Sequence, residues 1–518
     1  MPMNGGDTIM KKTRFPRNAV FLLSILLFAC ASGPPPVREG GQPASSDRGV
    51  VAITLLQMND IYELTPVSGG REGGLARVAT LRKELLRENP NTLTVLAGDL
   101  FSPSALGTAK VDGERLAGKQ IVATMNALGL DYITFGNHEF DIGEKSFLDR
   151  LGESRFTWIA SNVFDARNRS FPGVLANKVV EMRGAGGETV RLGMFGLTVD
   201  SNKAGYVTYK EVLDAARSQV AALRDRVDIL VALTHLSMDQ DVALAQTVPG
   251  IDLILGGHEH ENMQLWRGAG HVPIFKADAN ARTVYVHRLR YDTATGKTTI
   301  RSDLRRVTGE IPPDPATSAV VRHWQELGFA AFRAEGFQPE QVVATVPEPL
   351  DGLEASVRNG STALTRLIAE SMLEAVPGAE LSLYNSGSIR IDDVLPPGPL
   401  TQYDVIRILP FGGRICEAVI DGGLLRKVLE QGRANRGQGG FLQGAGVTRD
   451  EAGWRVNGEP LSDVRAYRVA TNDFLLSGRE QGLGFFSDKN PGVRSTCREN
   501  SDVRFVFRDH LRKRYGGR

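Results

Sequence analysis

Five short apolar runs in the first half of the chain each end in polar residues. Runs of this length are typical of buried strands, and several of the segments between them carry apolar residues at helical spacing. The apolar runs span residues 51–58, 93–97, 132–135, 229–233 and 251–255. Helices are predicted over 75–88, 120–128 and 211–225, and antiparallel strands over 282–291 and 297–307. This alternation indicates a layered α/β domain over residues 51–310.

A second domain is predicted after a proline-rich break at 311–315. The amphipathic segment 319–335 follows the break, and we expect a linker helix within residues 311–340. Residues 341–518 then contain strands, helices and glycine-rich loops of their own. The locally basic end, 504–518, is predicted to be a solvated helix.

The N-terminus has the pattern of an export signal. Basic residues between Lys11 and Arg17 precede an apolar run, 19–29, that is too short to cross a bilayer as a helix. The run ends in Leu27–Phe28–Ala29–Cys30, which resembles a bacterial lipobox, although Phe28 is less typical there than a small residue. Residues 1–30 are therefore predicted to be a signal peptide whose Cys30 receives lipid. Secretion by cleavage near Ala31 is the alternative.

The segment after the signal, residues 31–50, is rich in Pro, Gly and Ser and is predicted to be a flexible tether. Because Ala31 rather than Asp follows Cys30, the outer membrane is the favoured location. We expect an exported, lipid-anchored protein on the periplasmic or cell-surface face of a bacterial membrane.

Side chains that can bind metals or transfer protons follow all five apolar runs. Because the carboxyl ends of strands in an α/β sheet carry its chemistry, we expect these side chains to converge at one edge of one sheet. Four of the eight histidines of the chain lie at these strand ends. The strand ends are Asn59–Asp60, Gly98–Asp99, Gly136–Asn137–His138–Glu139, Thr234–His235 and Gly256–Gly257–His258–Glu259–His260.

Oxygen and nitrogen donors in this mixture suit Mn, Zn, Co or Fe rather than calcium. A carboxylate such as Asp99 can bridge two divalent ions, which clamp a phosphate and lower the pKa of a bound water. His138, oriented by Asp141, would stabilise negative charge or protonate the leaving oxygen. For the segment 133–141 alone, the alternative is a strand-ending turn with a satisfied histidine.

Length and composition limit which classes of fold and function are possible but do not identify one. The chain has 518 residues, 42% of them hydrophobic, and can bury two cores. A net charge of +1 gives no support for binding a nucleic-acid polymer, and nothing indicates an oligomeric state. The three cysteines lack zinc-site spacing. Cys416 is expected to be a buried small hydrophobe, with a Cys416–Cys497 disulfide as the alternative.

The polar strand ends, in this order, resemble the calcineurin-like metallophosphoesterases and, more narrowly, the bacterial 5′-nucleotidase/UDP-sugar hydrolase family. The likeness covers residues 51–510. It implies an N-terminal β-sandwich flanked by helices, an α/β substrate-binding domain after it, and two metal ions. By resemblance, one ion would be held by Asp60, Asp99, His260 and a further histidine, and the other by Asp99, Asn137, His235 and His258.

Three loops of the second domain resemble other signatures of this family. Residues 385–390 resemble its Asn-x-Gly-x-Ile-Arg loop, 409–413 its Pro-Phe-Gly loop, and 472–475 the loop that supplies a stacking aromatic. Two flat apolar faces suit a planar base, and arginine suits phosphate. For the phenylalanines, ordinary core is the alternative. By resemblance, Asn385, Arg390 and Arg358 contact the substrate, and Phe411 and Phe474 sandwich its base.

Two positions depart from the family pattern. Tyr62 stands where the family has a metal-binding histidine. We expect Tyr62 to point away and pack against the sheet, which leaves that ion weakly held, with ligation by the phenolate as the alternative. Leu483 stands where the family has an aspartate that binds ribose hydroxyls, and leucine accepts no hydrogen bond. This predicts weak discrimination of ribose from deoxyribose.

The predicted function is hydrolysis of nucleoside 5′-phosphates or nucleotide sugars outside the cytoplasm, by attack of metal-activated water on phosphorus. One alternative is a phosphoesterase for cyclic nucleotides or other phosphate esters. The other is a non-catalytic binding lipoprotein on a degraded scaffold, and the intact set of predicted ligands argues against it.

Overall fold

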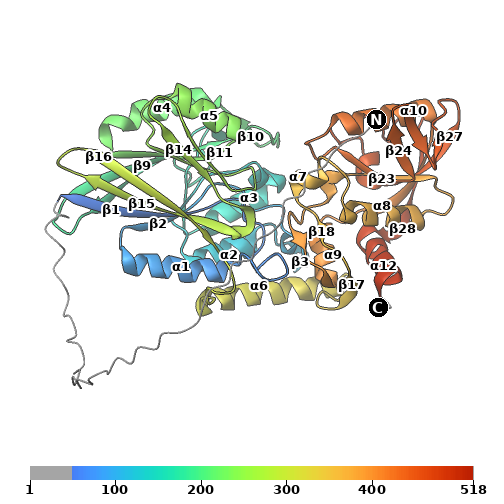
Figure 1. The fold of residues 1–518 in the computed structure, drawn as a ribbon, viewed down its shortest axis with the longest axis horizontal. Coiled ribbons are helices and arrows are strands. Elements are labelled where there is room, and N and C mark those ends of the chain that lie inside the picture. Colours follow the sequence, from blue (N-terminus) through green and yellow to red (C-terminus); the bar gives the residue numbers. More distant parts are fainter. Residues whose placement is uncertain (1–48, 517–518) are drawn as a thin grey trace, which may run out of the picture. The chain divides into compact units, whose positions relative to one another are not determined.

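The computed structural model describes residues 49–516, so the predicted signal peptide, Cys30 and nearly all of the predicted tether lie outside the described residues. Two six-stranded sheets form the N-terminal domain (Figure 1). In the first sheet, β1, β2, β5 and β6 run parallel, and β15 and β16 extend the β1 edge in antiparallel fashion. These strands span Val50–Met58 (β1), Thr92–Leu96 (β2), Tyr132–Ile133 (β5), Thr157–Trp158 (β6), Thr283–Asp292 (β15) and Lys297–Arg306 (β16).

The second sheet has the order β13-β14-β12-β11-β9-β8, with parallel pairs from β14 to β9 and antiparallel strands at both edges. Its strands span Asn177–Arg183 (β8), Thr189–Thr198 (β9), Ile229–His235 (β11), Leu253–Gly256 (β12), Met263–Arg267 (β13) and Val272–Lys276 (β14). Short pieces add β3 (Lys110–Val111), β4 (Glu114–Arg115), β7 (Val163–Asp165) and β10 (Val207–Tyr209).

A hydrophobic core lies between the two sheets. Successive side chains of a strand point to opposite faces, so Val51, Ile53 and Leu55 of β1 meet Val231 and Leu233 of β11 there. The outer face of each sheet is covered by helices, which gives four layers. The first sheet carries α1 (Leu75–Glu88), α2 (Lys119–Leu128) and α3 (Glu144–Glu153), and the second carries α4 (Val212–Leu223) and α5 (Met238–Thr247). The predicted β-sandwich flanked by helices is confirmed.

One predicted strand is shorter than expected. The apolar run 132–135 pairs as β5 only to Ile133. The carbonyl of Phe135 accepts from the Thr198 hydroxyl at 2.7 Å instead of from a neighbouring strand. The chain thus leaves the sheet two residues early and turns toward the polar residues that follow.

A single long helix, α6 (Pro315–Ala334), connects the two domains. Asp314 caps it by accepting from the backbone N–H of Thr317, and Pro315 occupies the first turn, where its missing N–H costs nothing. The helix packs on α1 and α2 of the first domain. Its Phe329 ring lies 4.8 Å from the ring of Tyr403 in the second domain, so α6 contacts both.

The C-terminal domain is built on a five-stranded sheet with the order β23-β19-β27-β22-β28. One face packs on α8 and α12, and the other packs on α10 and α11. The sheet comprises β19 (Leu381–Asn385), β22 (Arg414–Asp421), β23 (Leu442–Ala445), β27 (Ala466–Asn472) and β28 (Arg494–Asp502). The helices are α7 (Glu354–Val357), α8 (Ala363–Ala375), α9 (Gln402–Ile408), α10 (Gly422–Ala434), α11 (Asp473–Leu476) and α12 (Val503–Tyr515). Small sheets add β17 (Val342–Val346), β18 (Leu350–Asp351), β20 (Val394–Leu395), β21 (Gly398–Thr401), β24 (Val447–Asp450), β25 (Gly453–Val456) and β26 (Glu459–Pro460).

Two features of this domain differ from the sequence-based expectations. Cys416 is fully buried, but it is also bonded to Cys497, its direct partner in the β22–β28 pairing. The disulfide, which the sequence left as the alternative, is therefore formed. The terminal helix α12 is amphipathic rather than merely solvated, since Phe507 and Leu511 are buried in the core against α8.

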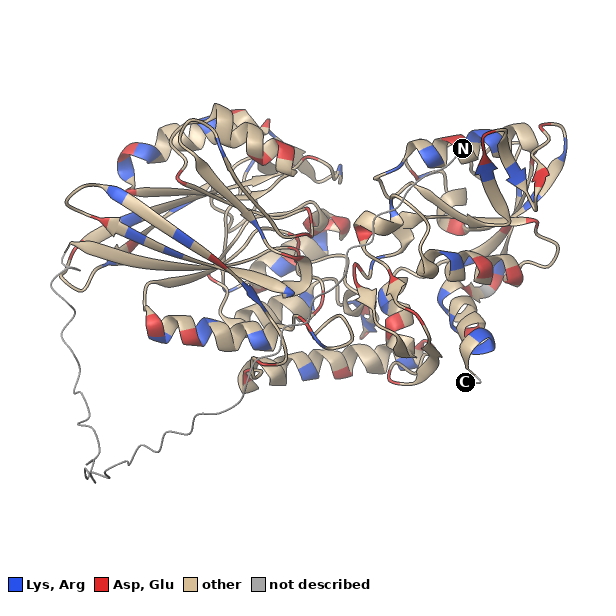
Figure 2. Ribbon diagram, viewed as in Figure 1, with Lys and Arg blue, Asp and Glu red and all other residues tan. Residues whose placement is uncertain are grey.

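Charges are spread over both domains. Figure 2 shows Lys and Arg interspersed with Asp and Glu along the helices and strands, in keeping with the net charge of +1. Among the described residues, no helix combines the length and apolarity needed to cross a membrane.

Candidate active site

The polar ends of the parallel strands meet at one place, but the expectation of a single sheet is wrong, since β1, β2 and β5 belong to the first sheet and β11 and β12 to the second. The backbone N–H of His138 donates to Asp99 Oδ1 at 2.9 Å, and that of His258 donates to Asp60 Oδ2 at 2.9 Å. Four residues here adopt left-handed backbone conformations, with φ of 54° at Asp60, 60° at Asp99, 85° at His258 and 60° at His260. Such conformations cost free energy in non-glycine residues and cluster at functional sites. Tight turns therefore aim these side chains inward.

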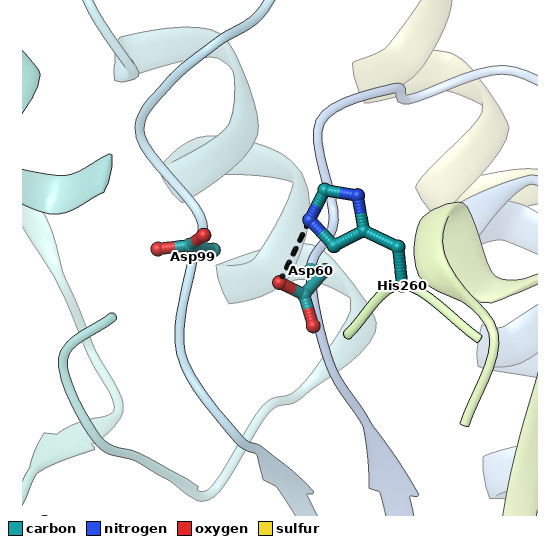
Figure 3. A group of neighbouring side chains, drawn as sticks. All are labelled: Asp60, Asp99 and His260. Atoms are coloured by element: carbon teal, nitrogen blue, oxygen red, sulfur yellow. Dashed lines mark ion pairs between the residues drawn. The ribbon is translucent and has the colours of Figure 1, made fainter. Parts of the chain in front are cut away.

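One group of candidate ligands consists of Asp60, Asp99 and His260, whose ligand atoms all lie within 4.8 Å of one another (Figure 3). Both carboxylates are fully buried. His260 Nε2 lies 3.3 Å from Asp60 Oδ1, the contact drawn as a dashed line in Figure 3. Tyr62 contributes its hydroxyl to the same group, 2.9 Å from Asp99 Oδ2 and 3.0 Å from His260 Nε2.

A second group shares Asp99 with the first. His235 Nε2 lies 3.3 Å from Asp99 Oδ2 and 3.2 Å from Asn137 Oδ1. Its other nitrogen, Nδ1, donates to the carbonyl of Ala97 at 2.8 Å, which turns Nε2 toward the site. The His258 ring packs edge-on against the His235 ring at 5.1 Å. The structure thus brings the six predicted metal ligands together, with Asp99 between the two groups.

The charges of this centre are strongly coupled. Burial alone would raise the pKa of Asp99, but the facing imidazoles of His235 and His138 hold it well below its ordinary value. Burial would lower the pKa of His235, yet the carboxylates of Asp99 and Asp60 raise it to about 9. Burial, aided by His235, lowers the pKa of His258 to about 3, so His258 is a neutral imidazole with a free lone pair.

The donor set fits divalent cations. Asp99 Oδ2, Asp60 Oδ1 and His260 Nε2 surround the Tyr62 hydroxyl at 2.9, 3.4 and 3.0 Å. Two carboxylate oxygens and an imidazole nitrogen thus converge on one point, and a divalent cation binds ligands of these types together.

The expectation for Tyr62 is wrong. Its side chain is 3% exposed and points into the centre, where its hydroxyl bonds to Asp99 and His260 rather than packing against the sheet. The reason is that the acceptors gathered there offer the phenol partners, which the apolar sheet cannot. Burial together with the charges of Asp99 and Asp60 raises the pKa of Tyr62 well above 10, so the phenol is neutral.

His138 lies beside the first group with Asp141 as its partner. Its Nδ1 donates to Asp141 Oδ2 at 2.7 Å, and the same oxygen accepts from the Ser102 hydroxyl at 3.1 Å. Asn202 donates to the other oxygen of Asp141 at 3.0 Å, which fixes the carboxylate. Burial would lower the pKa of His138, but Asp141 and Asp99 raise it, which favours the imidazolium near neutral pH.

Two contributing residues were missed by sequence reasoning. Glu139 is fully buried, and its carboxylate accepts from the backbone N–H groups of Asp99, Leu100, Phe101 and Gly136, which ties two strand-end loops together. An acidic residue buried directly after Asn137–His138 was the available signal. The other is Asp392 of the C-terminal domain, whose Oδ2 accepts from His260 Nδ1 at 2.9 Å. No local sequence pattern marks Asp392.

A cavity of about 1020 Å³ opens above the centre, lined by residues of both domains. The N-terminal domain contributes Asp99, Asn137, His138, Asp141, His258 and His260. The C-terminal domain contributes Arg358 and Arg390. Arg390 Nε is buried and has no hydrogen-bond partner among the described residues. Arg358 forms an ion pair with Glu354. The cavity thus places arginine side chains opposite the candidate metal ligands.

The other predicted substrate contacts lie outside the lining of this cavity. Phe411 and Phe474 are 47% and 38% exposed, which excludes ordinary core for both rings. The Arg390 guanidinium lies 5.7 Å from the Phe411 ring, and that of Arg479 lies 5.5 Å from the Phe474 ring. Asn385 is buried and accepts from the Ser388 hydroxyl.

Leu483 does not face the cavity. It is fully buried in the core of the C-terminal domain with Leu429 and Phe486. Its neighbours Arg479 and Gln481 line the cavity instead. Any contact to a sugar from this loop would therefore come from those two residues.

Two family models match the chain. The model of the calcineurin-like phosphoesterases matches residues 53–262, and that of the 5′-nucleotidase C-terminal domain matches residues 342–487. A trifunctional nucleotide phosphoesterase protein, YfkN, of Bacillus subtilis is 28% identical over 88% of this chain, and the match spans about a third (34%) of its own length. A 5′-nucleotidase of Bos taurus is 25% identical over 85% of both chains.

Among solved structures, a 5′-nucleotidase precursor of Thermus thermophilus superposes with a TM-score of 0.73 at 24% identity. The match covers 90% of this chain and 97% of that one. At this identity the likeness shows a shared two-domain fold.

Proposed function

Because the chain belongs to the calcineurin-like metallophosphoesterases that carry a 5′-nucleotidase C-terminal domain, and so to hydrolases of phosphate esters, we propose that it hydrolyses nucleoside 5′-phosphates or related nucleotides such as nucleotide sugars. The observation that carries this proposal is the meeting of two buried carboxylates, three histidines and an asparagine beneath an arginine-lined cavity.

The proposed cofactor is a pair of divalent ions of Mn, Zn, Co or Fe. One would be held by Asp60, Asp99 and His260, and the other by Asp99, Asn137, His235 and His258. Such ions, when bound, neutralise phosphate charge and lower the pKa of a coordinated water. Asp99 is placed to serve both because its Oδ2 faces His235 as well as Tyr62.

The side chains of the protein would supply the proton for the leaving oxygen and part of the positive charge that faces the phosphate. His138 is held by Asp141 as an imidazolium at the cavity wall, where it can donate to the leaving oxygen and stabilise negative charge on phosphorus. Arg390, with an unpaired Nε, offers a charged donor to a phosphate oxygen. Phe411 and Phe474, both partly exposed, offer flat faces for a base.

The test is phosphate release by the purified protein with added Mn²⁺, Zn²⁺ or Co²⁺. The panel contains nucleoside 5′-monophosphates, UDP-glucose, cyclic nucleotides and simple phosphate monoesters, because one relative is named a trifunctional nucleotide phosphoesterase. His138→Ala is expected to lower kcat by about two orders of magnitude while bound metal, measured by elemental analysis, stays unchanged.

The control is His323→Ala, since His323 is exposed on α6, and it should keep the parent's kcat. Absence of phosphate release from every substrate with every metal would overturn the proposal. Phosphate release from cyclic nucleotides or simple monoesters alone would replace the proposed substrate class with the alternative one.

We also propose that the protein acts outside the cytoplasm, held on a bacterial membrane by lipid on Cys30. The support is the basic, apolar and Cys-terminated start of the chain and the Cys416–Cys497 disulfide, since such bonds persist in oxidising compartments.

A further inference from the structure

His260 is held from both sides by residues that are far apart in the chain. Its Nε2 faces Asp60 Oδ1 at 3.3 Å and the Tyr62 hydroxyl at 3.0 Å, within the N-terminal domain. Its Nδ1 lies 2.9 Å from Oδ2 of Asp392, 132 positions along the chain in the C-terminal domain. A candidate metal ligand of one domain is therefore hydrogen-bonded to a carboxylate of the other.

Asp392 is itself held rigidly. Its second oxygen, Oδ1, accepts from the backbone N–H of Glu354 at 2.9 Å. Its backbone has φ of 40°, a left-handed conformation that few residues other than Gly, Asn and Asp adopt readily. The side chain is buried, and the Arg282 guanidinium lies 3.9 Å from Oδ2, farther away than His260. The carboxylate is thus fixed by its own domain with one oxygen aimed at His260.

We propose that Asp392 is a positioning residue that orients His260 toward the metal centre from the opposite domain. This inference rests on the proposed function. A carboxylate that accepts from Nδ1–H fixes the tautomer, leaves the lone pair on Nε2 and makes that nitrogen more basic. With Asp392 in place, Nε2 faces Asp60 and Tyr62 as a ligand atom.

The neighbouring carboxylate provides a comparison. Asp393 also crosses between the domains, but it accepts from the backbone N–H of Ser68 at 2.7 Å and from Arg407 at 3.4 Å. It has no hydrogen bond or ion pair with a candidate ligand among the described residues. Two adjacent aspartates therefore make cross-domain contacts of similar kind, and Asp392 alone of the two touches His260.

The experiment compares Asp392→Asn with Asp393→Asn in the full chain, by titrating metal-free protein with Mn²⁺ against a chelator. In Asp392→Asn, an amide keeps one acceptor for the Glu354 N–H and loses the acceptor for His260 Nδ1–H. We expect the affinity for one equivalent of Mn²⁺ to fall by about 10–100-fold. Asp393→Asn should bind Mn²⁺ as the parent does. A loss of stability from breaking a domain contact would appear in both variants, and thermal unfolding monitors it.

A second readout reports on the imidazole itself. In Zn²⁺-loaded protein with ¹⁵N-labelled histidine, His260 should give an Nδ1–H signal with Nε2 bound to metal, assigned by its absence from His260→Gln. We expect this signal to be lost in Asp392→Asn and kept in Asp393→Asn. A purely structural role for Asp392 would leave it in place.

The outcomes separate this inference from the proposed function. If the parent binds metal and releases phosphate but Asp392→Asn matches it in Mn²⁺ affinity and in the His260 signal, the positioning role is overturned and the proposed function stands. Equal losses in both aspartate variants would also overturn it, by assigning the effect to domain contact in general. If the parent binds no divalent metal, the proposed metal centre fails, and this inference fails with it.

Discussion

At the residue scale, Tyr62 is predicted to weaken the binding of an ion in one half of the proposed metal centre. Its hydroxyl occupies the point where Asp60, Asp99 and His260 face one another. Burial and the adjacent carboxylates raise the pKa of the phenol well above 10, so it is neutral. A neutral phenol is a weaker ligand for Mn²⁺ or Zn²⁺ than an imidazole. The ion beside Asp60 should therefore be the weaker of the two.

Tyr62→His should increase the affinity for the second equivalent of Mn²⁺ by roughly tenfold, or about 1.4 kcal/mol, because an imidazole nitrogen is a stronger ligand than a neutral phenol oxygen. Calorimetric titration of metal-free protein measures this, and Tyr62→Phe is the control because it removes the hydroxyl without adding a ligand. Two equally tight equivalents in the parent, unchanged by Tyr62→His, would contradict the prediction. A visible charge-transfer band in iron-loaded protein would instead indicate a tyrosinate ligand.

At the scale of elements, β15 carries a histidine that the site does not use. His287 is fully buried, with Nε2 2.9 Å from Gln57 Oε1 of β1 and Nδ1 2.7 Å from the Ser302 hydroxyl of β16. Burial lowers the pKa of His287 from 6.5 to about 3. A histidine whose pKa is lower in the folded state stabilises the fold above the unfolded pKa and opposes it as the pH falls. The free energy of unfolding should therefore fall as the pH is lowered.

His287→Gln should reduce this acid sensitivity. Below pH 6.5 His287 becomes protonated in the unfolded parent, whereas in the folded state it stays neutral down to about pH 3. The parent thus loses about 2 kcal/mol between pH 6.5 and 5 from this group, and the variant does not. Urea unfolding of metal-free protein at both pH values measures the difference. His323→Gln is the control, because His323 of α6 is exposed. Identical losses in parent and His287→Gln would refute the argument.

At the scale of the whole molecule, one buried guanidinium contacts carboxylates of both domains. Arg407 of α9 is 7% exposed and pairs with Glu63 of the N-terminal domain at 3.2 Å. It also pairs with Asp393 and Asp404 at 3.4 and 3.3 Å. Removing one partner from such a buried cluster would leave an uncompensated charge. Glu63 lies three residues after Asp60 in the chain. Its ion pair with Arg407 therefore joins the two domains close to the candidate metal ligands.

Attachment to a membrane is a property of the whole molecule that the N-terminus is predicted to supply. Cys30→Ala should move the protein from the membrane fraction to the soluble fraction, or leave it unprocessed, because the thiol that would carry the lipid is removed. Fractionation of expressing cells followed by mass measurement tests this, with Ser32→Ala as the control. If Cys30→Ala stays with the membranes as fully as the parent does, the lipoprotein prediction is wrong.

Local pattern was enough to predict most of the elements and the residues at the strand ends. The helix predicted over 75–88 is α1 with the same bounds, because its apolar residues recur at helical spacing and one face must be buried. Asp60, Asp99 and Asn137 could be placed together because each follows a strand of the first sheet, whose parallel neighbours end at the same edge. His235 and His258 lie at the ends of strands of the second sheet, and the packing of the two sheets brings them to the same place.

Tertiary structure decided the features that depend on side-chain direction and on contacts between distant segments. The sequence led us to expect Tyr62 against the sheet, and the hydrogen-bond partners contributed by Asp99 and His260 draw it inward. Asp392 reaches His260 across 132 positions of sequence, and the pairing of Cys416 with Cys497 follows from the register of β22 and β28. The sequence determined which residues would lie at the strand ends, whereas long-range packing determined which atoms would face one another, because neither rotamer nor register between distant segments is encoded locally.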